Sequence, residues 1–309
     1  MSTLELTRTV FMGSPEFALL TLQALAESLL VVGVVTQPDR PAGRGRVLTP
    51  PPVKLLAQSL GFPVIQPRRL REAEAMEQLR LWAPDLIVVA AFGQILRPAV
   101  LELPRYGCIN VHASLLPRWR GAAPIQAALL AGDEHSGVTI MRMDAGIDTG
   151  PTLSQRSLAV LPEDNTLSLG ARLAELGAQL LLETLPGYLN GELLPQPQAE
   201  IGATYAPMLK KEEGALDFTR PAEDLARQVR AFYPWPGAFT YWNDLLLKIH
   251  RAHAISISGY APGHRLIHDG LPAIATPAGL LVIDELQPAG KKSLPGQQFL
   301  QGARIWGSA

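Results

Sequence analysis

The sequence contains a single cysteine, Cys108, among its 309 residues. One cysteine excludes a disulfide within the chain and any metal cluster built from cysteines. Because Cys108 lies in an apolar run, we expect its thiol to be buried and inert rather than nucleophilic. No apolar stretch reaches the ~18 uninterrupted residues of a membrane span, and residues 1–5 lack a basic segment followed by an apolar core. The sequence therefore predicts neither a membrane helix nor a secretory signal, and we expect a cytoplasmic protein.

Several nucleotide and acyl-transfer signatures are also missing. No G-x-G-x-x-G follows the first apolar run, which disfavours a dinucleotide cofactor, and the Gly-Arg-Gly at residues 43–45 lacks the Lys-Ser/Thr ending of a P-loop. Ser114 lies outside any G-x-S-x-G elbow, which disfavours acyl-serine chemistry. The net charge of −1 does not by itself indicate nucleic-acid binding, so local basic clusters matter more.

The chain has enough apolar residues for two domains, because 47% of its residues are hydrophobic. Its first two hundred residues alternate β-branched apolar runs with segments of helical spacing. Strands are predicted over residues 9–12, 30–35, 86–91, 108–112 and 138–143, and helices over 15–28, 53–61, 70–82 and 165–190. This alternation predicts an α/β fold with a doubly wound, mostly parallel sheet, whose ligands bind beyond the carboxyl ends of the strands.

The composition changes after about residue 205. Short apolar runs broken by proline and glycine follow, over residues 232–242, 246–250, 266–268, 273–275 and 280–284. This pattern is typical of a small β-barrel. We therefore expect a first domain over residues 1–204, including a linker from about residue 190, and a second domain over residues 205–309.

Two polar residues interrupt the apolar strand predicted over residues 108–112. Asn110 and His112 are two positions apart, so they project to the same side of an extended segment, and burying them is costly unless they are used or satisfied. About thirty residues on, the glycine-containing loop 144–150 could return Asp148 to the imidazole. An amide, an imidazole and a carboxylate together are typical of an acid/base site with an oxyanion donor.

The same residues also allow a structural interpretation. A His-Asp pair in an α/β protein can be a satisfied core network or two ligands of a metal. A metal normally needs three protein ligands, and His135, the other histidine of this half, lies in a polar segment where we expect it to be exposed. No metal site is predicted.

Residues 36–52 form the most basic irregular segment. They hold Arg40, Arg44 and Arg46 against the single acid Asp39, with Lys54 just beyond, and they contain five prolines and two glycines. Proline and glycine disfavour a regular element, so we expect a loop with basic tips, either a solvated connector or a contact to nucleic acid.

The turn at residues 13–16 carries helix-start chemistry. Ser14 is expected to cap the following helix, with Pro15 at the first helical position and Glu16 in the first turn. The alternative is a backbone donor site for an anionic or ester group of a substrate.

Five tracts closely resemble the methionyl-tRNA formyltransferases, a family of folate-dependent formyltransferases. They are residues 36–46, 110–112, 114–126, 144–150 and 287–292, so the resemblance spans nearly the whole chain. Ala113 departs from the glycine of many relatives by only a methyl group. The resemblance implies an α/β formyltransferase domain, followed by a C-terminal OB-like barrel that binds tRNA. It also implies formyl transfer from 10-formyltetrahydrofolate to the α-amine of initiator methionyl-tRNA. We expect a monomer.

The resemblance also implies roles for particular residues. Asn110 would stabilise the oxyanion, His112 would relay the proton, and Asp148 would hold the imidazole in its useful tautomer and stabilise its charged form. The folate would be held largely by backbone groups of Phe92, Gly93, Gln94, Ile95, Leu96, Ser114, Leu115, Leu116, Pro117, Asp144 and Gly146. The side chains of Ile95, Leu96, Leu115 and Leu116 would then be ordinary core.

For tRNA, the implied contacts are Arg40, Arg44 and Arg46 in the first domain and Lys210, Lys211, Lys291 and Lys292 in the second. Taken singly, each lysine is more often a surface charge that aids solubility than a contact to tRNA. Two rival functions remain: a folate formyltransferase for a small amine, and a non-catalytic RNA-binding protein. The basic segment and the second domain argue against the first, and the intact Asn110, His112 and Asp148 argue against the second.

Overall fold

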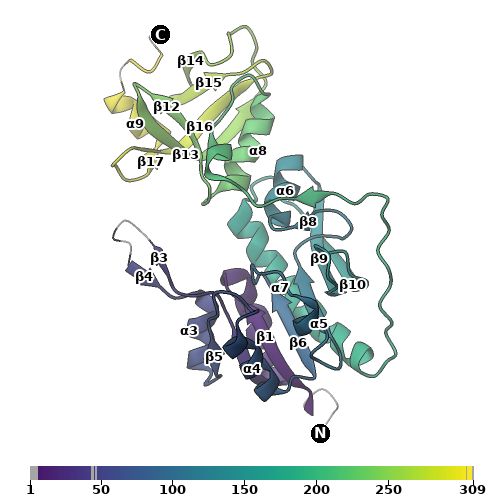
Figure 1. Cartoon of the computed structure of the whole chain (residues 1–309). Coiled ribbons are helices and arrows are strands. Elements are labelled where there is room, and N and C mark those ends of the chain that lie inside the picture. The colour runs from purple at the N-terminus through teal and green to yellow at the C-terminus, as the bar shows by residue number, and fades with distance from the viewer. Residues whose placement is uncertain (1–5, 43–44, 46, 304, 308–309) are drawn as a thin grey trace. The chain divides into compact units, whose positions relative to one another are not determined.

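The computed structural model describes residues 6–42, 45, 47–303 and 305–307, and it divides into two compact units (Figure 1). The first unit contains the described parts of Met1–Pro124, His135–Ala159 and Gly170–Ala206. The second contains the described parts of Ile125–Glu134, Val160–Leu169 and Pro207–Ala309. Within the described ranges, none of the helices has the length and apolar character needed to cross a bilayer.

A seven-stranded sheet forms the centre of the first unit. Its strands, in spatial order, are β10 (Thr152–Ala159), β9 (His135–Arg142), β7 (Cys108–His112), β6 (Leu86–Ala90), β1 (Arg8–Gly13), β2 (Leu30–Val35) and β5 (Val64–Ile65). The pairs from β7 to β5 are parallel, whereas β9 is antiparallel to both β7 and β10. The predicted α/β class with a mostly parallel sheet is confirmed.

Helices connect these strands along the chain. They are η1 (Glu16–Ala18), α2 (Leu19–Ser28), α3 (Pro52–Ser59), α4 (Ala73–Trp82), α5 (Pro98–Leu101), α6 (Pro124–Ala131) and α7 (Thr166–Leu189). Residues 125–131 of α6 and 166–169 of α7 belong to the second unit. Leu79 and Trp82 of α4 share one buried cluster with Val10 and Ile87 of the sheet. A Cβ on Gly33 would lie 2.5 Å from the Trp82 ring, so only glycine allows α4 to pack this closely on β2.

The expected cap at the start of the first helix is wrong. The first turn is η1, and Pro15 rather than Ser14 occupies its N-cap position. The Ser14 hydroxyl oxygen instead accepts from the Gln37 backbone N–H at 3.1 Å and from the Thr36 hydroxyl at 3.3 Å. Because β1 and β2 are adjacent and parallel, their carboxyl ends lie together, and Ser14 links them.

The basic segment 36–52 is more regular than its prolines and glycines predict. β3 (Arg40–Ala42) and β4 (Val47–Thr49) form a separate antiparallel pair, so the expectation of no regular element is wrong. Pro41 is tolerated because both strands of a two-stranded ribbon are edge strands, which can accommodate a residue without an N–H. Arg44 and Arg46 lie outside the described residues.

The second unit is built around an antiparallel sheet. Its strands, in spatial order, are β12 (Ala238–Trp242), β13 (Leu245–Ile255), β16 (Leu280–Pro288), β15 (Leu271–Ala275) and β14 (Arg265–His268), with β17 (Leu294–Pro295) on β16. It also contains η2 (Lys211–Gly214), α8 (Ala222–Phe232) and α9 (Gly296–Gly302). Leu225 and Val229 of α8 share a buried core with Leu247, Ile249 and Leu281 of the sheet. This confirms the predicted C-terminal β domain.

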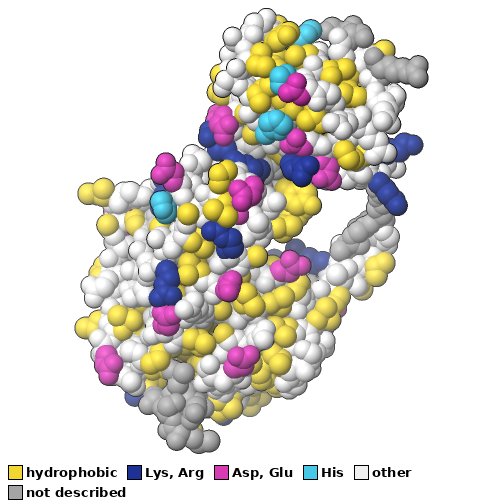
Figure 2. All heavy atoms as spheres, turned by 180° about the vertical axis from the view of Figure 1, so that it is seen from behind, with side chains coloured by type: hydrophobic (Ala, Val, Ile, Leu, Met, Phe, Trp, Pro, Cys, Tyr) yellow, Lys and Arg dark blue, Asp and Glu magenta, His cyan; other side chains and the backbone are white. Residues whose placement is uncertain are grey.

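The surface charge agrees with the small net charge of the chain. On the face shown in Figure 2, basic and acidic side chains are interspersed among hydrophobic and uncharged ones instead of gathering by sign. This face therefore has no broad electrostatic field of one sign that would guide a charged ligand to it. On this face, recognition of a charged ligand has to rest on particular residues.

Candidate active site

β7 presents two buried polar side chains near its carboxyl end. Asn110 is 8% exposed and His112 is 5% exposed, while their neighbours Ile109 and Val111 are packed in the core. β7 lies between β6 and β9, so both edges of the strand are paired. Because polar groups this deeply buried need partners, the contacts of the amide and the imidazole define the site.

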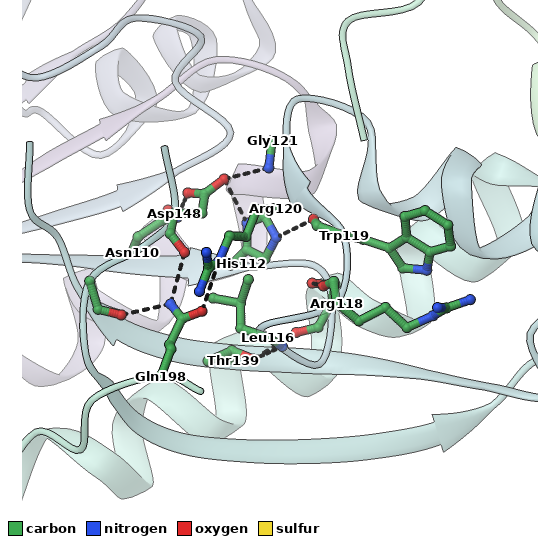
Figure 3. A network of polar contacts seen from close by, with 12 residues as sticks. Asn110, His112, Leu116, Arg118, Trp119, Arg120, Gly121, Thr139, Asp148 and Gln198 are labelled. Carbon is green, nitrogen blue, oxygen red and sulfur yellow. Dashed lines mark hydrogen bonds and ion pairs between the residues drawn. The ribbon is translucent and has the colours of Figure 1, made fainter. Parts of the chain in front are cut away.

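Asp148 supplies those contacts from the loop between β9 and β10 (Figure 3). Its Oδ1 accepts a long hydrogen bond from Asn110 Nδ2 at 3.4 Å, and its Oδ2 lies 3.6 Å from His112 Nδ1. Oδ2 also accepts from the Gly121 backbone N–H at 2.8 Å. The structure thus places together the three residues that the sequence selected.

The His112 ring is oriented by a backbone carbonyl. Its Nε2 lies 3.0 Å from the Trp119 oxygen. A carbonyl can only accept, so Nε2 must carry a proton, and in the neutral ring Nδ1 then has a free lone pair. This differs from the expectation that Asp148 sets the tautomer: in the structure, the Trp119 carbonyl makes that hydrogen bond. Asp148 is placed to stabilise a proton on Nδ1.

Left-handed backbone occurs in both loops that contact His112. Trp119 has φ +61°, Gly121 has φ +115° and Asp148 has φ +52°. For a residue with a Cβ this conformation costs about 1 kcal/mol or more and persists only where the surroundings enforce it. Contacts with the rest of the first unit must therefore hold Trp119 and Asp148 in place.

The tract after β7 is tied down internally. Ser114 is 1% exposed and its hydroxyl donates to the Arg118 carbonyl at 2.6 Å. Thr139 Oγ1 donates to the Ser114 carbonyl at 2.7 Å and accepts from the Leu116 N–H at 3.0 Å. Leu116 is buried, whereas Leu115 and Pro117 are half-buried. A buried, bonded hydroxyl is a poor nucleophile, which agrees with the expectation that Ser114 performs no acyl-serine chemistry.

The loop after β6 divides between core and surface. The Phe92 and Leu96 side chains are each 2% exposed and belong to the core of the first unit, whereas Ile95 is 73% exposed. Gly93 has φ +78°. The Gln94 amide accepts from the Leu70 N–H at 3.0 Å and donates to the Pro67 carbonyl at 3.2 Å. Within this predicted folate tract, Phe92 and Leu96 can therefore contact a ligand only through their backbone groups.

A cavity of about 530 Å³ borders this loop and is rich in arginine. Its lining includes Gln94, Ile95, Arg68, Arg69, Arg71, Arg80 and Arg97. Sequence reasoning missed this site, although the arginine density of residues 68–80 was a visible signal. In the part of the chain that the structure describes, none of these guanidinium groups has an ion pair. The cavity therefore suits an anionic ligand.

The glycine loop that carries Asp148 begins with a self-contained turn. The Asp144 carboxylate accepts from the Gly146 N–H at 2.9 Å and from the Thr149 hydroxyl at 2.8 Å. Asp144 and Gly146 are both exposed. The Asp144 side chain is thus engaged within its own loop, and this loop offers an approaching ligand mainly its backbone.

The predicted tRNA contacts lie in both units. Arg40 is exposed and donates to Gln37 Oε1 at 3.2 Å. Lys54 is not a free cation, because its Nζ lies 2.7 Å from Asp39; hydrogen bonds from Lys54 and Gln66 lower the pKa of that carboxyl. Lys210, Lys211, Lys291 and Lys292 are exposed in the second unit. The last two line a largely apolar cavity of about 610 Å³ together with Trp242, Leu245 and Phe299.

Two other expectations concern cysteine and metal chemistry. Cys108 is buried, and this burial raises the pKa of its thiol to about 12, which agrees with an inert side chain. His135 is exposed at the start of β9, as predicted. Among the residues that can be described, no group of three histidine, cysteine, aspartate or glutamate side chains could hold a metal ion.

Sequence reasoning also missed Arg120 and Gln198, whose side chains reach the Asp148 loop. Gln198 Nε2 donates to the Asp148 carbonyl at 2.8 Å, and Arg120 Nε donates to Gln198 Oε1 at 3.1 Å. Arg120 lies in the family-like tract 114–126, but Gln198 lies in a stretch rich in proline and glutamine that carries no motif. Only the fold shows that this stretch returns to the site.

Comparisons with known proteins agree along the whole length. The families described as "Formyl transferase" and "Formyl transferase, C-terminal domain" match residues 7–185 and 208–304. The chain is 52% identical over 300 residues to the methionyl-tRNA formyltransferase of Myxococcus xanthus, covering 96% of both proteins. It is 51% identical over 301 residues to the methionyl-tRNA formyltransferase of Citrifermentans bemidjiense, covering 96% of this chain and 94% of the relative.

Two solved structures share the fold. The methionyl-tRNA formyltransferase from Clostridium thermocellum matches with a TM-score of 0.57 at 16% identity, over 90% of this chain and 99% of that one. HypX from Aquifex aeolicus, solved with tetrahydrofolic acid, matches with a TM-score of 0.64 at 19% identity, over 97% of this chain and 48% of that one. At these identities the structural matches bear on the fold alone.

Proposed function

This chain belongs to the methionyl-tRNA formyltransferase family, and we propose that it takes its formyl group from 10-formyltetrahydrofolate. The enzyme formylates the amine of methionyl-tRNA for translation initiation. The observation that carries the proposal is the convergence of Asn110, His112 and Asp148 at the end of β7. Transfer from the 10-formyl isomer, with one tetrahydrofolate released per amine formylated, tests the donor. Efficient transfer from the 5-formyl isomer instead would overturn it.

The reaction needs an oxyanion donor. 10-Formyltetrahydrofolate supplies a formyl group attached to its N10 nitrogen. When the amine attacks the formyl carbon, the carbonyl oxygen gains negative charge before the bond to N10 breaks. The Asn110 amide has two N–H groups, of which one faces Asp148 Oδ1. We assign the other N–H to the developing oxyanion, a contact that strengthens only along the reaction path.

The reaction also moves one proton, from the attacking amine to the departing N10. His112 Nδ1 has the free lone pair that can accept this proton, because Nε2 is committed to the Trp119 carbonyl. Asp148 Oδ2, 3.6 Å from Nδ1, stabilises the imidazolium that results. His112 then donates the proton to the leaving nitrogen, so the ring ends each turnover neutral and no covalent enzyme intermediate forms.

The folate is proposed to lie along the loops after β6 and β9. Exposed backbone of Gly93, Asp144 and Gly146 suits a flat ring with alternating donors and acceptors. Ser114, Leu115, Leu116 and Pro117 would line the formyl end through backbone groups. The arginine-lined cavity beside Gln94 and Ile95 supports this orientation, because the glutamate tail of a folate is anionic. We propose that these arginines bind the tail carboxylates.

Arg71→Ala and Arg97→Ala should therefore raise the KM for 10-formyltetrahydrofolate by about tenfold each, the value of one charge-assisted contact. The increase should be larger for a donor with several γ-linked glutamates than for the monoglutamate, while the KM for tRNA and kcat stay unchanged. Arg105→Ala is the matched control, since Arg105 is exposed, lies against Tyr106 and does not line the cavity. A rise in the tRNA KM instead would assign the cavity to the nucleic acid.

For tRNA we propose contacts from the β3–β4 hairpin and from the second domain. Arg40 lies in β3 and is exposed, and Arg44 and Arg46 follow it in the sequence before β4, whose Val47 and Leu48 are 68% and 65% exposed. A hairpin with an exposed arginine and exposed apolar side chains suits a nucleic-acid end, where bases and phosphates are both accessible. In the second domain, Lys210, Lys211, Lys291 and Lys292 are proposed to contact the tRNA backbone.

Arg44→Ala should lower kcat/KM for methionyl-tRNA by a factor of about 5 to 150, equivalent to roughly 1–3 kcal/mol, with folate binding unchanged. If Arg44 contacts a phosphate, the salt slope of tRNA binding should fall in magnitude by about 0.7–0.9. If it contacts a base, discrimination between initiator and elongator tRNA should change instead. Unchanged activity and unchanged salt dependence would show that the hairpin segment is only a solvated connector.

Other features remain part of the proposal. We place the catalytic domain at residues 1–204, including the linker from about 190, and the tRNA-binding domain at 205–309. A cytoplasmic monomer that needs no metal would fit this function. A formyltransferase for a small amine is the main rival, but such a substrate needs neither the hairpin segment nor a second domain.

A further inference from the structure

The backbone of Asp148 needs outside support. Its φ of +52° is unfavourable for a residue with a side chain, and the hydrogen bonds of its carboxylate, from Asn110 and Gly121, do not fix its carbonyl. A carboxylate that stabilises a transient charge works only if its position is held to within a fraction of an ångström. The groups that hold the Asp148 main chain therefore bear on the chemistry.

Gln198 provides this support with a single amide. Its Nε2 donates to the Asp148 carbonyl at 2.8 Å and to the Gly150 carbonyl at 2.7 Å, so it joins two turns of the loop (Figure 3). Its Oε1 accepts from Arg120 Nε at 3.1 Å. Only this orientation of the amide satisfies all three contacts, because carbonyls accept and the guanidinium donates. Both ends of the Gln198 side chain are thus fixed.

Arg120 anchors Gln198 in turn. It is 1% exposed, and both of its terminal nitrogens lie 3.4 Å from the Glu200 carboxylate. Burial lowers the pKa of Arg120, but hydrogen bonds with Tyr205 and Glu200 outweigh it and keep the group charged. The next residue, Gly121, donates its N–H to Asp148 Oδ2. Arg120 and Gly121 thus support the Asp148 main chain and its carboxylate from one strand, β8 (Arg120–Gly121).

The segment that carries Gln198, residues 196–206, is itself fixed to this strand. We call it the return segment. Gln196 pairs with Thr152 through its backbone, and Thr204 accepts from the Trp119 N–H at 2.9 Å through its hydroxyl and from the Arg120 N–H at 2.9 Å through its carbonyl. It ends in β11 (Tyr205–Ala206), which pairs in parallel with β8. The return segment therefore also supports Trp119, whose carbonyl orients His112.

We propose that Gln198, anchored by Arg120, is a positioning residue that fixes the Asp148 carboxylate against His112. This inference rests on the catalytic role proposed for Asp148. Gln198 touches neither substrate nor the reacting atoms. It acts through the main chain of the loop, so its loss should slow the chemical step and leave the binding of both substrates almost unchanged.

Gln198→Glu tests this directly, because it keeps the size of the side chain and its contact with Arg120 but removes both donors to the loop. The expected result is a kcat lower by about tenfold to a hundredfold, the scale of a misplaced catalytic group. The KM values for methionyl-tRNA and for the folate should stay within about twofold, because neither substrate contacts Gln198. Gln198→Ala should give a loss of similar size without adding a charge.

Gln196→Glu is the matched control. It introduces the same charge in the same return segment, but the Gln196 side chain is exposed and, among the described residues, donates a hydrogen bond to the Leu194 carbonyl alone. Its kcat should equal that of the unmodified enzyme. Equal losses of kcat in Gln198→Glu and Gln196→Glu would overturn the proposal. A Gln198→Ala variant with a lowered melting temperature but an unchanged kcat would also overturn it, because Gln198 would then have only a structural role.

A double-mutant cycle with Arg120→Lys tests the anchoring. If Arg120 acts through Gln198, the double variant should lose no more kcat than the worse single variant, since the second change removes a support that is already missing. If the fold-losses in kcat of the two single variants multiply in the double variant, Arg120 does not act through Gln198. His112→Ala distinguishes failure of the proposed function from failure of this inference. An unchanged kcat in the His112→Ala variant would overturn the proposed function. A large loss of kcat in that variant, with no loss in the Gln198 variants, would overturn only the positioning role of Gln198.

Discussion

Replacing His112 with alanine should lower kcat by at least about a hundredfold, the usual scale for loss of a positioned acid/base group. The proton that leaves the attacking amine would then have no acceptor next to it. In the structure, the ring is fixed at Nε2 by the Trp119 carbonyl and faces Asp148 Oδ2 through Nδ1, so Nδ1 is the ring atom left to accept a proton. Single-turnover formylation at saturating folate measures the effect.

Binding of the folate should be retained in the His112→Ala variant, because the imidazole is not among the groups proposed to hold it. Titration of folate binding and the melting temperature show whether the fold and the site survive the substitution. His135→Ala is the matched control, since His135 is exposed at the start of β9 and should leave kcat unchanged. Near-normal turnover by a folded His112→Ala variant would remove His112 from the mechanism.

Replacing Asn110 with alanine should lower kcat by about a hundredfold or more, the effect of removing one oxyanion donor. The oxyanion exists only along the reaction path, so the KM for tRNA and the affinity for folate should hardly change. Among the described residues, the Asn110 amide donates a single hydrogen bond, a long one of 3.4 Å to Asp148 Oδ1, so the substitution should have a small effect on stability. Steady-state kinetics with each substrate varied in turn measure these quantities.

An exposed asparagine at the end of α7, Asn190, provides the control for this substitution. Asn190→Ala should leave kcat and both KM values unchanged. An Asn110→Ala variant defective only in tRNA affinity would contradict the oxyanion assignment, because it would place Asn110 in substrate binding.

The elements that pack on both faces are the ones that sequence alone predicts well. Residues 30–35 and 108–112 are predicted as strands and are β2 and β7 with the same bounds, because fully buried parallel strands read as continuous apolar runs. The polar interruptions within β7 are equally visible in the sequence. A buried strand that carries Asn110 and His112 stands out against its own hydrophobicity, which is why the sequence alone can propose this strand end as the active site.

Predictions from local sequence preferences failed where contacts between distant parts of the chain determine the structure. Ser14 has the residue type of a helix cap, but its hydroxyl is used by Gln37 from the neighbouring strand end. Pro41 disfavours a strand in general, yet an edge of a two-stranded ribbon accepts it. Gln198 carries no sequence signal, because its proposed role depends on residues 196–206 folding back against β8. Gln198 and Arg120, which are hydrogen-bonded, lie seventy-eight positions apart in the sequence.

The measurement that tests the central claim most directly is transfer of labelled formyl from 10-formyltetrahydrofolate to three acceptors in parallel. They are initiator methionyl-tRNA, elongator methionyl-tRNA and glycinamide ribonucleotide. The account predicts rapid labelling of initiator methionyl-tRNA, slower labelling of the elongator and none of the small amine, with labelling of the initiator abolished by His112→Ala. Faster labelling of glycinamide ribonucleotide, or labelling of tRNA that survives the His112 substitution, would contradict it.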